Sequence, residues 1–216
     1  MTEPLLQAVE LSCERDDRVL FRQLNVSIVP GTLTRVEGPN GSGKTTLLRI
    51  FAGLSDAFSG EILWQGRPRP AMREWANRNT LYLGHRAGIK GLLTPLENLR
   101  ALTFGRQTCS EALLRDALDG VGLGPWADVP CQNLSAGQKR RVALARLLFS
   151  DEPLWILDEA FTALDVEAVA ALERLLTERV REGGAVVMTT HHEPDLAMLQ
   201  RVRLGDVTRS ATVAEV

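Results

Sequence analysis

The sequence contains few cysteines and no motif that groups them. Its 216 residues include three, Cys13, Cys109 and Cys131, which are far apart and form neither a CxxC nor a CxxCH pattern. An odd number of scattered cysteines predicts neither a disulfide framework nor a zinc site. We therefore expect thiols without a metal or redox role, in a reducing compartment.

Long apolar runs and an excess of one charge are also missing. The sequence has no stretch of about 18 apolar residues, so we do not expect it to cross a membrane by itself. Glu3 and Pro4 stand where a secretory signal has a basic segment followed by an apolar run. A net charge of −2 provides no basic field for nucleic acid, and we expect no nucleic-acid partner.

The residues that are present predict a globular α/β protein. Hydrophobic residues make up 44% and charged residues 24%, close to the average for folded domains, which excludes a disordered or fibrous chain. Short apolar runs, glycine-rich turns and helical segments alternate, as in α/β units. We expect strands at 24–28, 33–37, 60–65, 154–157 and 185–190, and helices at 45–54, 94–104, 110–118, 138–149 and 166–181.

The most specific motif is a glycine-rich segment between an expected strand and an expected helix. It fits the pattern GxxxxGK[ST] and consists of Gly38, Pro39, Asn40, Gly41, Ser42, Gly43, Lys44 and Thr45. The glycines let backbone N–H groups turn inward around a phosphate chain, and the helix N-terminus faces the same anion. Lys44 places a cation on the outer phosphates, and the Thr45 hydroxyl can join a Mg²⁺ shell. We add Thr46 to this predicted ATP-binding set.

A second motif is an apolar strand that ends in two carboxylates. Residues 154–157 are apolar, and Asp158 and Glu159 follow at the expected strand end. In a phosphate-loop protein, the first carboxylate can hold Mg²⁺ through water. The second can orient or deprotonate the attacking water. We therefore predict that Asp158 belongs to the metal site and Glu159 to the catalytic site.

A third motif predicts a second helix N-terminus that can meet an anion. It comprises Leu134, Ser135, Ala136, Gly137 and Gln138. Ser135 is suited to cap the helix, and Gly137 allows a ligand to approach closely. On its own, this segment is as well explained by an ordinary helix cap with a basic face.

These three segments, in this order, resemble the ATP-binding subunit of ABC transporters, with Ala136 where glycine is more usual. The resemblance covers nearly the whole chain. It implies a RecA-like P-loop NTPase core at 1–84 and 141–216, an inserted helical signature subdomain at about 85–140, and a small antiparallel β subdomain. It also implies a head-to-tail dimer with two ATP molecules, in which the signature residues of one copy face the phosphate loop of the other.

The resemblance assigns two further residues. Asp165 matches the loop that crosses the dimer interface, and His191 matches the switch histidine at the γ-phosphate. Together with Lys44 and Glu159, His191 completes the implied catalytic set. We expect its neighbour His192 to be exposed.

Three positions depart from the family pattern. Arg15 stands where an aromatic residue usually stacks on adenine; an arginine can stack on a purine, but a solvated loop arginine is an equal alternative. His85 stands where a glutamine usually joins the core to the helical subdomain, at the coupling loop. Ala160 replaces the proline that commonly follows the two carboxylates, which predicts a looser turn.

Local strings, among them residues 13–16, 62–66 and 134–147, resemble one subfamily, the ATP-binding subunits of haem-handling transporters in bacterial cytochrome c maturation. This resemblance implies an ATP hydrolase that acts in haem export or in release of a haem-loaded chaperone. It implies integral membrane subunits as partners, and a peripheral place on the cytoplasmic face of the bacterial inner membrane. We expect no direct haem binding, because all three histidines fall at or beside the predicted ATP chemistry and CxxCH is absent.

Three other functions remain open. The chain could serve an ABC importer or exporter with another cargo, because the membrane subunit selects the cargo. It could be a soluble ABC ATPase of translation or DNA repair, although such proteins usually carry two cassettes or a long coiled coil, and no sustained heptads are present. A non-catalytic ATP clamp would need neither Glu159 nor His191.

Overall fold

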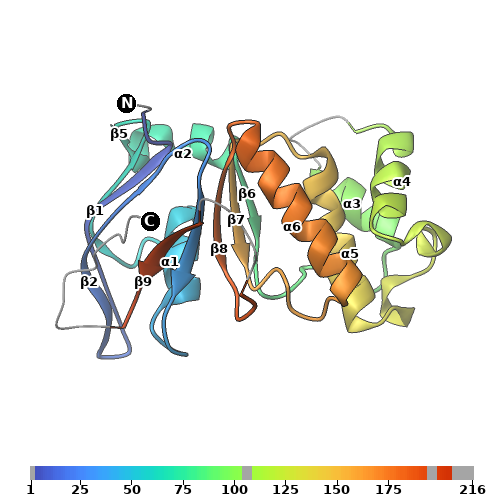
Figure 1. Ribbon diagram of the computed structural model, residues 1–216, viewed down its shortest axis with the longest axis horizontal. Coiled ribbons are helices and arrows are strands. Elements are labelled where there is room, and N and C mark those ends of the chain that lie inside the picture. The colour runs from blue at the N-terminus through green and yellow to red at the C-terminus, as the bar shows by residue number, and fades with distance from the viewer. Residues whose placement is uncertain (1–2, 104–108, 194–198, 206–216) are drawn as a thin grey trace. The chain divides into compact units, whose positions relative to one another are not determined.

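The chain divides into two compact units in the computed structural model, which describes residues 3–103, 109–193 and 199–205 (Figure 1). Unit 1 comprises 1–82, 152–159 and 176–216, and unit 2 comprises 83–151 and 160–175. The helical subdomain expected at about 85–140 falls within unit 2, which extends further along the chain. The phosphate loop and both carboxylates belong to unit 1, whereas the signature segment belongs to unit 2.

A five-stranded sheet of unit 1 carries Asp158 at the end of one strand, and Glu159 follows directly. Its strand order is β6 (Thr80–Leu83), β7 (Leu154–Asp158), β8 (Ala185–Thr189), β3 (Leu33–Glu37), β9 (Leu199–Arg203). Every residue of β7 and β8 is buried, as expected for apolar strands covered on both faces. These two strands run parallel, and their register places Asp158 directly beside Thr189.

The second sheet of unit 1 is antiparallel. Its order is β2 (Arg18–Ile28), β1 (Leu6–Arg15), β4 (Ser59–Trp64), β5 (Arg67–Pro68). Asp16 and Asp17, between β1 and β2, have φ angles of 52° and 57°, the left-handed conformation typical of a tight hairpin. The predicted strand at 24–28 is the second half of β2.

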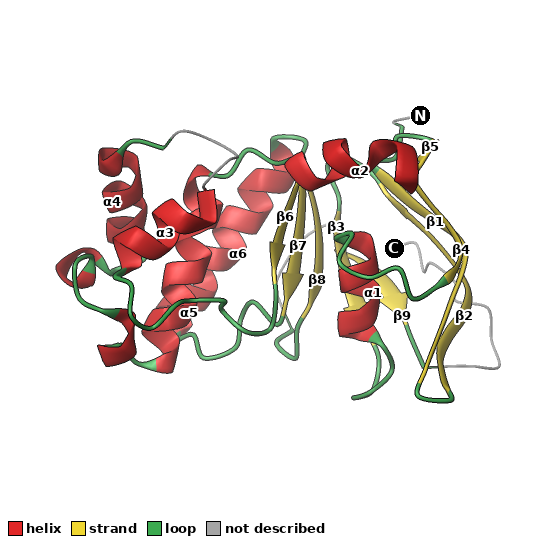
Figure 2. Cartoon of the chain, turned by 180° about the vertical axis from the view of Figure 1, so that it is seen from behind, coloured by secondary structure: helices red, strands yellow, loops and turns green. Residues whose placement is uncertain are grey.

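Helix α1 (Lys44–Phe51) lies between the two sheets of unit 1 (Figure 2). Its Leu47, Leu48, Ile50 and Phe51 are buried in a core shared with residues of both sheets. The helix ends earlier than the predicted 45–54 because Gly53 adopts a φ of 76°, and the Leu54 N–H returns to the Arg49 carbonyl at 2.8 Å. Helix α2 (Arg69–Arg78), which the sequence did not predict, follows β5.

Unit 2 is mainly helical. Its elements are α3 (Pro95–Thr103), α4 (Glu111–Gly120), the 3₁₀-helices η1 (Gly124–Trp126) and η2 (Cys131–Asn133), α5 (Ala136–Leu144), the 3₁₀-helix η3 (Ala145–Phe149) and the first part of α6 (Val166–Arg181). The helices predicted at 94–104, 110–118 and 166–181 are present, although Phe104 lies outside the described residues. The predicted single helix at 138–149 is instead two: α5 begins at Ala136, and the backbone becomes 3₁₀ at Ala145.

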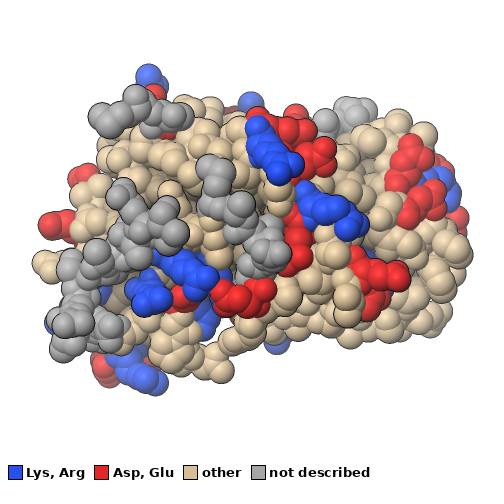
Figure 3. Space-filling model, in the orientation of Figure 1, with Lys and Arg blue, Asp and Glu red and all other residues tan. Residues whose placement is uncertain are grey.

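Neither unit contains a membrane span in the part of the chain that the structure describes: no helix there is both long and apolar enough. On the face shown in Figure 3, the side chains of lysine and arginine lie intermixed with those of aspartate and glutamate. This distribution agrees with the small net charge of −2.

Candidate active site

The phosphate loop, residues 38–45, turns from β3 into α1 through glycines that the backbone requires. Gly38 has a φ of 149°, and a Cβ there would lie 2.5 Å from the Leu204 carbonyl oxygen. Gly43 has a φ of 95°, and a Cβ there would lie 2.9 Å from Leu20 Cβ in β2. Both positions therefore exclude larger residues, which fits a loop that wraps closely around a ligand.

The polar groups of this loop fit a phosphate chain. The Lys44 ammonium donates hydrogen bonds to the carbonyl oxygens of Gly38 (2.7 Å) and Pro39 (3.1 Å), so it is folded over the loop. Ser42 Oγ is buried and has no hydrogen-bond partner among the described residues. No side chain in the described part of the chain caps the N-terminus of α1, and no acidic residue lies in its first turn. An anion at this helix end meets free N–H groups and two side-chain donors.

The two carboxylates occupy the carboxyl end of β7. Asp158 is buried, and its Oδ1 accepts a 2.6 Å hydrogen bond from the Thr189 hydroxyl in β8. Glu159 has a φ of 54°, an uncommon value for a non-glycine residue that marks a sharp turn. Its N–H donates to the carbonyl oxygen (3.1 Å) and the hydroxyl oxygen (3.0 Å) of Thr189. Thr189 therefore orients both predicted residues, a role that sequence analysis missed.

The structure brings Glu159 and His191 together. His191 follows β8 by two residues, and its Nε2 lies 3.6 Å from Glu159 Oε1. The Glu159 side chain is only 14% exposed, whereas the His191 side chain is 73% exposed. His192 is exposed, as predicted, and its N–H donates to Thr190 Oγ1 at 2.9 Å. A mostly buried carboxylate and an exposed imidazole at this distance can contact the same ligand.

Tyr82 is a further neighbour of this site that sequence analysis missed. Burial, together with the negative charge of Asp158, raises the pKa of the Tyr82 phenol above its ordinary value, although Arg49 acts in the opposite direction. The phenol therefore stays protonated beside the carboxylate.

Among the described residues, no group of three or more His, Cys, Asp or Glu side chains could hold a metal. A cation at Asp158 would need other oxygen donors, such as the Thr45 hydroxyl and phosphate oxygens.

Arg15 ends β1 at the tip of the first hairpin. Its side chain is 72% exposed, and its Nε lies 3.5 Å from the carboxylate of Asp16. The neighbouring strand is closer to the phosphate loop, because Leu20 and Phe21 are the residues that a Cβ at Gly43 would meet. The guanidinium is thus accessible, and its predicted stacking on adenine stays a prediction.

In unit 2, the signature segment forms a capped helix start. Ser135 Oγ accepts a hydrogen bond from the Gln138 N–H (3.1 Å), and the Ser135 N–H donates to Gln138 Oε1 (2.9 Å), which completes a capping box. A Cβ on Gly137 would lie 2.9 Å from the Ala163 carbonyl oxygen, so this position needs glycine for close packing. Ser135 and Ala136 are exposed, so the helix N-terminus is open to a ligand.

Two arginines of α5 contact the remaining predicted parts of unit 2: Arg141 pairs with Asp165, and Arg140 contacts the residue before His85. Asp165 accepts a hydrogen bond from the Ala168 N–H at the start of α6 (2.9 Å) and is paired with Arg141. Arg140, which is buried, donates to the carbonyl oxygens of Gly84 (2.9 Å) and Ala160 (3.3 Å). Gly84 precedes His85, whose side chain is exposed.

The chain is similar over most of its length to known proteins of one family. The model of the ABC transporter family matches residues 21–162, about two thirds of the chain. A "Cytochrome c biogenesis ATP-binding export protein CcmA" from Hahella chejuensis is 50% identical over 206 residues, 95% of this chain and 98% of that protein. The protein of the same name from Vibrio cholerae is 48% identical over 205 residues, 94% of this chain and 99% of that protein.

Solved structures share the fold at lower identity. An ATP-binding subunit of an ABC transporter has a TM-score of 0.82 at 23% identity and covers 97% of this chain and 90% of that chain. A dimeric ATP-binding cassette bound to ADP and Pi, in a post-hydrolysis state, has a TM-score of 0.81 at 23% identity, with 98% and 99% covered.

The chain belongs to the ABC transporter family, and it is an ATP-hydrolysing subunit of such a transporter. Within that family it belongs with the cytochrome c biogenesis ATP-binding proteins, to which it is about half identical over almost its full length.

Proposed function

We propose that this ABC ATPase couples ATP hydrolysis to haem handling in c-type cytochrome biogenesis, either by haem export or by release of a haem-loaded chaperone. The observation that carries the chemistry is Glu159, fixed by Thr189 at the end of β7 with His191 3.6 Å away. The biological role rests on the similarity to the cytochrome c biogenesis proteins.

Nucleotide binding is assigned to the phosphate loop. Backbone N–H groups of residues 38–43 and the start of α1 surround the phosphates, and Lys44 leaves the loop carbonyls to contact the outer phosphate oxygens. Ser42, Thr45 and Thr46 add hydroxyl donors or acceptors at the same end of the helix. The exposed Arg15 is assigned to the adenine.

We assign Mg²⁺ to the Thr45 hydroxyl and the Asp158 carboxylate, hard oxygen donors that suit this ion. When bound, Mg²⁺ neutralises charge on the phosphate oxygens. The buried Thr189 hydroxyl holds Asp158 in one rotamer, which keeps its carboxylate aimed without the entropy loss of ordering a free side chain.

Hydrolysis is assigned to Glu159 as the residue that orients or deprotonates water, with Lys44 and His191 stabilising the transferring phosphoryl group. The low exposure of Glu159 strengthens its electrostatic interactions. His191 is exposed enough to approach a γ-phosphate. This arrangement follows the general logic of phosphoryl transfer, in which positioning and charge supply most of the rate.

Two kinds of partner complete the proposed cycle. A second copy of the chain presents Ser135 and Gly137 to the ATP held by the first, and Asp165 lies at the copy interface. Integral membrane subunits receive the motion through the region of His85, and they hold the chain on the cytoplasmic face of the inner membrane. Closure driven by ATP and opening after hydrolysis shift the population of membrane-subunit states.

The catalytic assignment is tested by Glu159→Gln. We expect hydrolysis to fall by more than about 100-fold while ATP binding persists, because the amide keeps the shape and loses the base. The ATP-bound dimer becomes long-lived. Glu74→Gln, an exposed carboxylate paired with Arg78, is the matched control and retains activity. Unchanged hydrolysis in both Glu159→Gln and Lys44→Ala would contradict the site assignment.

The biological role is tested by affinity purification of the chain from its native membranes. Co-purification of cytochrome c maturation membrane subunits, with a haem Soret band, supports the proposal. A different permease leaves the ATPase chemistry standing and contradicts the haem role. Recovery of no membrane protein in gentle detergent favours a soluble ABC ATPase instead.

A further inference from the structure

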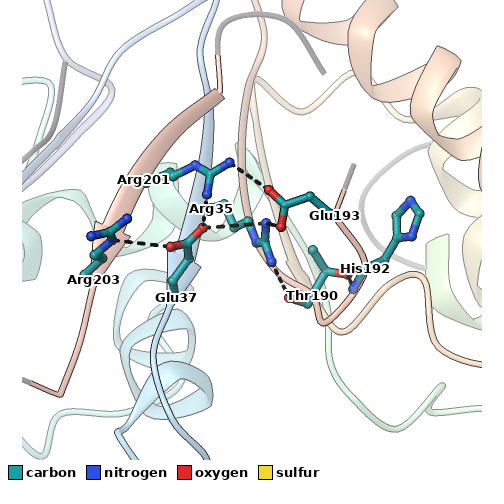
Figure 4. Close-up of polar contacts among 7 residues, drawn as sticks. All are labelled: Arg35, Glu37, Thr190, His192, Glu193, Arg201 and Arg203. Carbon is teal, nitrogen blue, oxygen red and sulfur yellow. Dashed lines mark hydrogen bonds and ion pairs between the residues drawn. The ribbon is translucent and has the colours of Figure 1, made fainter. Parts of the chain in front are cut away.

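Arg35 contacts both ends of the 190–193 segment, which carries His191. Arg35 lies in the middle of β3, and its side chain is only 10% exposed. Its Nη1 donates to Glu193 Oε2 at 2.6 Å, and its Nη2 donates to the Thr190 carbonyl oxygen at 3.4 Å. One guanidinium therefore bridges residues 190 and 193 (Figure 4). In the sequence, His191 and His192 lie between these two residues.

A second guanidinium holds the same carboxylate from the neighbouring strand. Arg201 in β9 donates from Nη2 to Glu193 Oε1 (2.7 Å) and from Nη1 to Glu37 Oε1 (3.1 Å). Glu37 is the last residue of β3 and directly precedes Gly38 of the phosphate loop. The Arg35–Arg201 pair is set by the sheet, because the β3–β9 register places these residues side by side. The two oxygens of Glu193 are thus fixed by two different strands (Figure 4).

The sheet does not need these ion pairs to hold β3 and β9 together. A parallel ladder already pairs the strands from Leu33 opposite Leu199 to Glu37 opposite Arg203. Strand β8, which pairs with β7 and β3, ends at Thr189. The 190–193 segment therefore lies beyond this backbone pairing. Its described links to the sheet include those made by Arg35 and Arg201. The ion pairs thus act where backbone pairing has stopped.

We propose that Arg35 and Glu193 are positioning residues, which fix the 190–193 segment so that the His191 imidazole stays beside Glu159. This inference rests on the proposed function, in which His191 contacts the γ-phosphate. An imidazole that is 73% exposed has little packing to hold it, so its direction depends on the backbone that carries it. A fixed backbone lowers the entropy lost when His191 meets the transferring phosphate. The same link joins this segment to Glu37, one residue before the phosphate loop.

The test compares Glu193→Gln and Arg35→Gln in the purified full-length chain with Mg²⁺ and ATP. We expect kcat to fall about tenfold, because the histidine is misplaced in the transition state. KM for ATP stays within about twofold, because the phosphate loop is unchanged. Arg203→Gln is the matched control: its guanidinium lies 3.6 Å from Glu37 and is 76% exposed, and it makes no described contact with the 190–193 segment. It retains both kcat and KM.

A second measurement separates positioning from general stability. If Glu193 acts through His191, Glu193→Gln has no further effect on kcat in a His191→Ala chain, whereas a purely structural change lowers kcat in both backgrounds. Arg35→Lys restores part of the kcat lost in Arg35→Gln, because one ammonium can pair with Glu193 but cannot bridge both contacts. Arg35 is buried and its glutamine variant can lose stability, so Glu193→Gln, at a side chain 64% exposed, carries the decision.

Three results would overturn the inference in distinguishable ways. If Glu193→Gln keeps the wild-type kcat while His191→Ala loses it, Glu193 has no positioning role. The proposed function is then unaffected. Equal losses from Glu193→Gln with and without His191 show that the carboxylate does not act through the histidine. Hydrolysis that is insensitive to both Glu159→Gln and His191→Ala removes the proposed function itself, and the inference with it.

Discussion

The Thr189 hydroxyl donates a 2.6 Å hydrogen bond to Oδ1 of Asp158, its direct neighbour across the parallel β7–β8 ladder. Both residues are about 1% exposed. The same hydroxyl oxygen accepts a hydrogen bond from the Glu159 N–H at 3.0 Å. One side chain on β8 thus aims the carboxylate assigned to Mg²⁺ and fixes the backbone of the residue assigned to water activation.

Replacement of this hydroxyl in Thr189→Val should affect stability and metal dependence together. Loss of a hydrogen bond to a buried carboxylate predicts a decrease in the free energy of unfolding of about 1–3 kcal/mol. A less well-aimed Asp158 also raises the Mg²⁺ concentration needed for half-maximal hydrolysis. Denaturant unfolding and a Mg²⁺ titration of ATPase activity measure the two effects.

The matched control is Thr189→Ser, which keeps the hydroxyl and loses only a methyl group. We expect it to retain the wild-type Mg²⁺ dependence. A valine variant with wild-type stability and wild-type Mg²⁺ dependence would show that the hydrogen bond to Asp158 has no role in the site.

The signature segment offers a prediction that depends only on unit 2. Ser135→Ala removes one side of the capping box and should lower the free energy of unfolding by about 1 kcal/mol. Gly137→Ala places a Cβ 2.9 Å from the Ala163 carbonyl oxygen, and the forced shift should cost about 1–3 kcal/mol. Urea unfolding measures both losses.

Ala136→Gly is the control for both variants, since it introduces the residue that the family usually has, at an exposed position. The decrease in its free energy of unfolding should stay below about 1 kcal/mol, the ordinary cost of glycine in a helix. If Gly137→Ala is as stable as the wild type, the close approach of Ala163 does not restrict this position.

Arg140 makes a further prediction about the turn after the carboxylates. Its guanidinium donates to the carbonyl oxygens of Gly84 and Ala160, and it is buried. Arg140→Met keeps the apolar stem and removes these donors, so unfolding free energy should fall by about 1–3 kcal/mol. Chemical denaturation checks this value. Arg86→Met, at an exposed side chain nearby in the sequence, serves as the control and should change stability by less than about 0.5 kcal/mol.

Elements with strong local patterns could be predicted from the sequence, and elements without them could not. The predicted strand at 33–37 and the helix at 166–181 have the bounds of β3 and α6, since apolar composition and glycine stops define them locally. Helix α2 was missed because prolines lie at positions 68 and 70 and proline usually ends a regular element, although a proline fits the first turn of a helix. Strand β1 was missed because bulges interrupt its alternation.

The same distinction applies to the candidate site. The phosphate loop is contiguous, so its spacing alone predicts its chemistry. Thr189 is 31 positions from Asp158, and Glu193 is 158 positions from Arg35. These contacts depend on which strands become neighbours, and no local pattern encodes that order. Sequence analysis therefore predicted candidate reacting groups, which stay predictions, and missed the side chains that orient them.

The final prediction concerns the pH dependence of the Glu193 ion pairs. Hydrogen bonds from Arg35 and then Arg201 lower the pKa of Glu193 below its ordinary value of 4.5. A carboxyl whose pKa is lower in the folded chain favours folding when it is ionised. Its contribution is complete above the unfolded pKa and is lost as pH falls from about 4.5 through the folded pKa.

The free energy of unfolding should therefore be higher for the wild type than for Glu193→Gln at about pH 7, and the difference should shrink at about pH 3.5. Urea unfolding of both chains at the two pH values measures it. The pKa values of Glu111 and Asp128 are also lowered by hydrogen bonds from arginines, so these groups also contribute to the loss of stability in acid. They are present in both chains, and the subtraction removes their effect. A difference that stays constant or grows on acidification would contradict an ionised Glu193 held by Arg35 and Arg201.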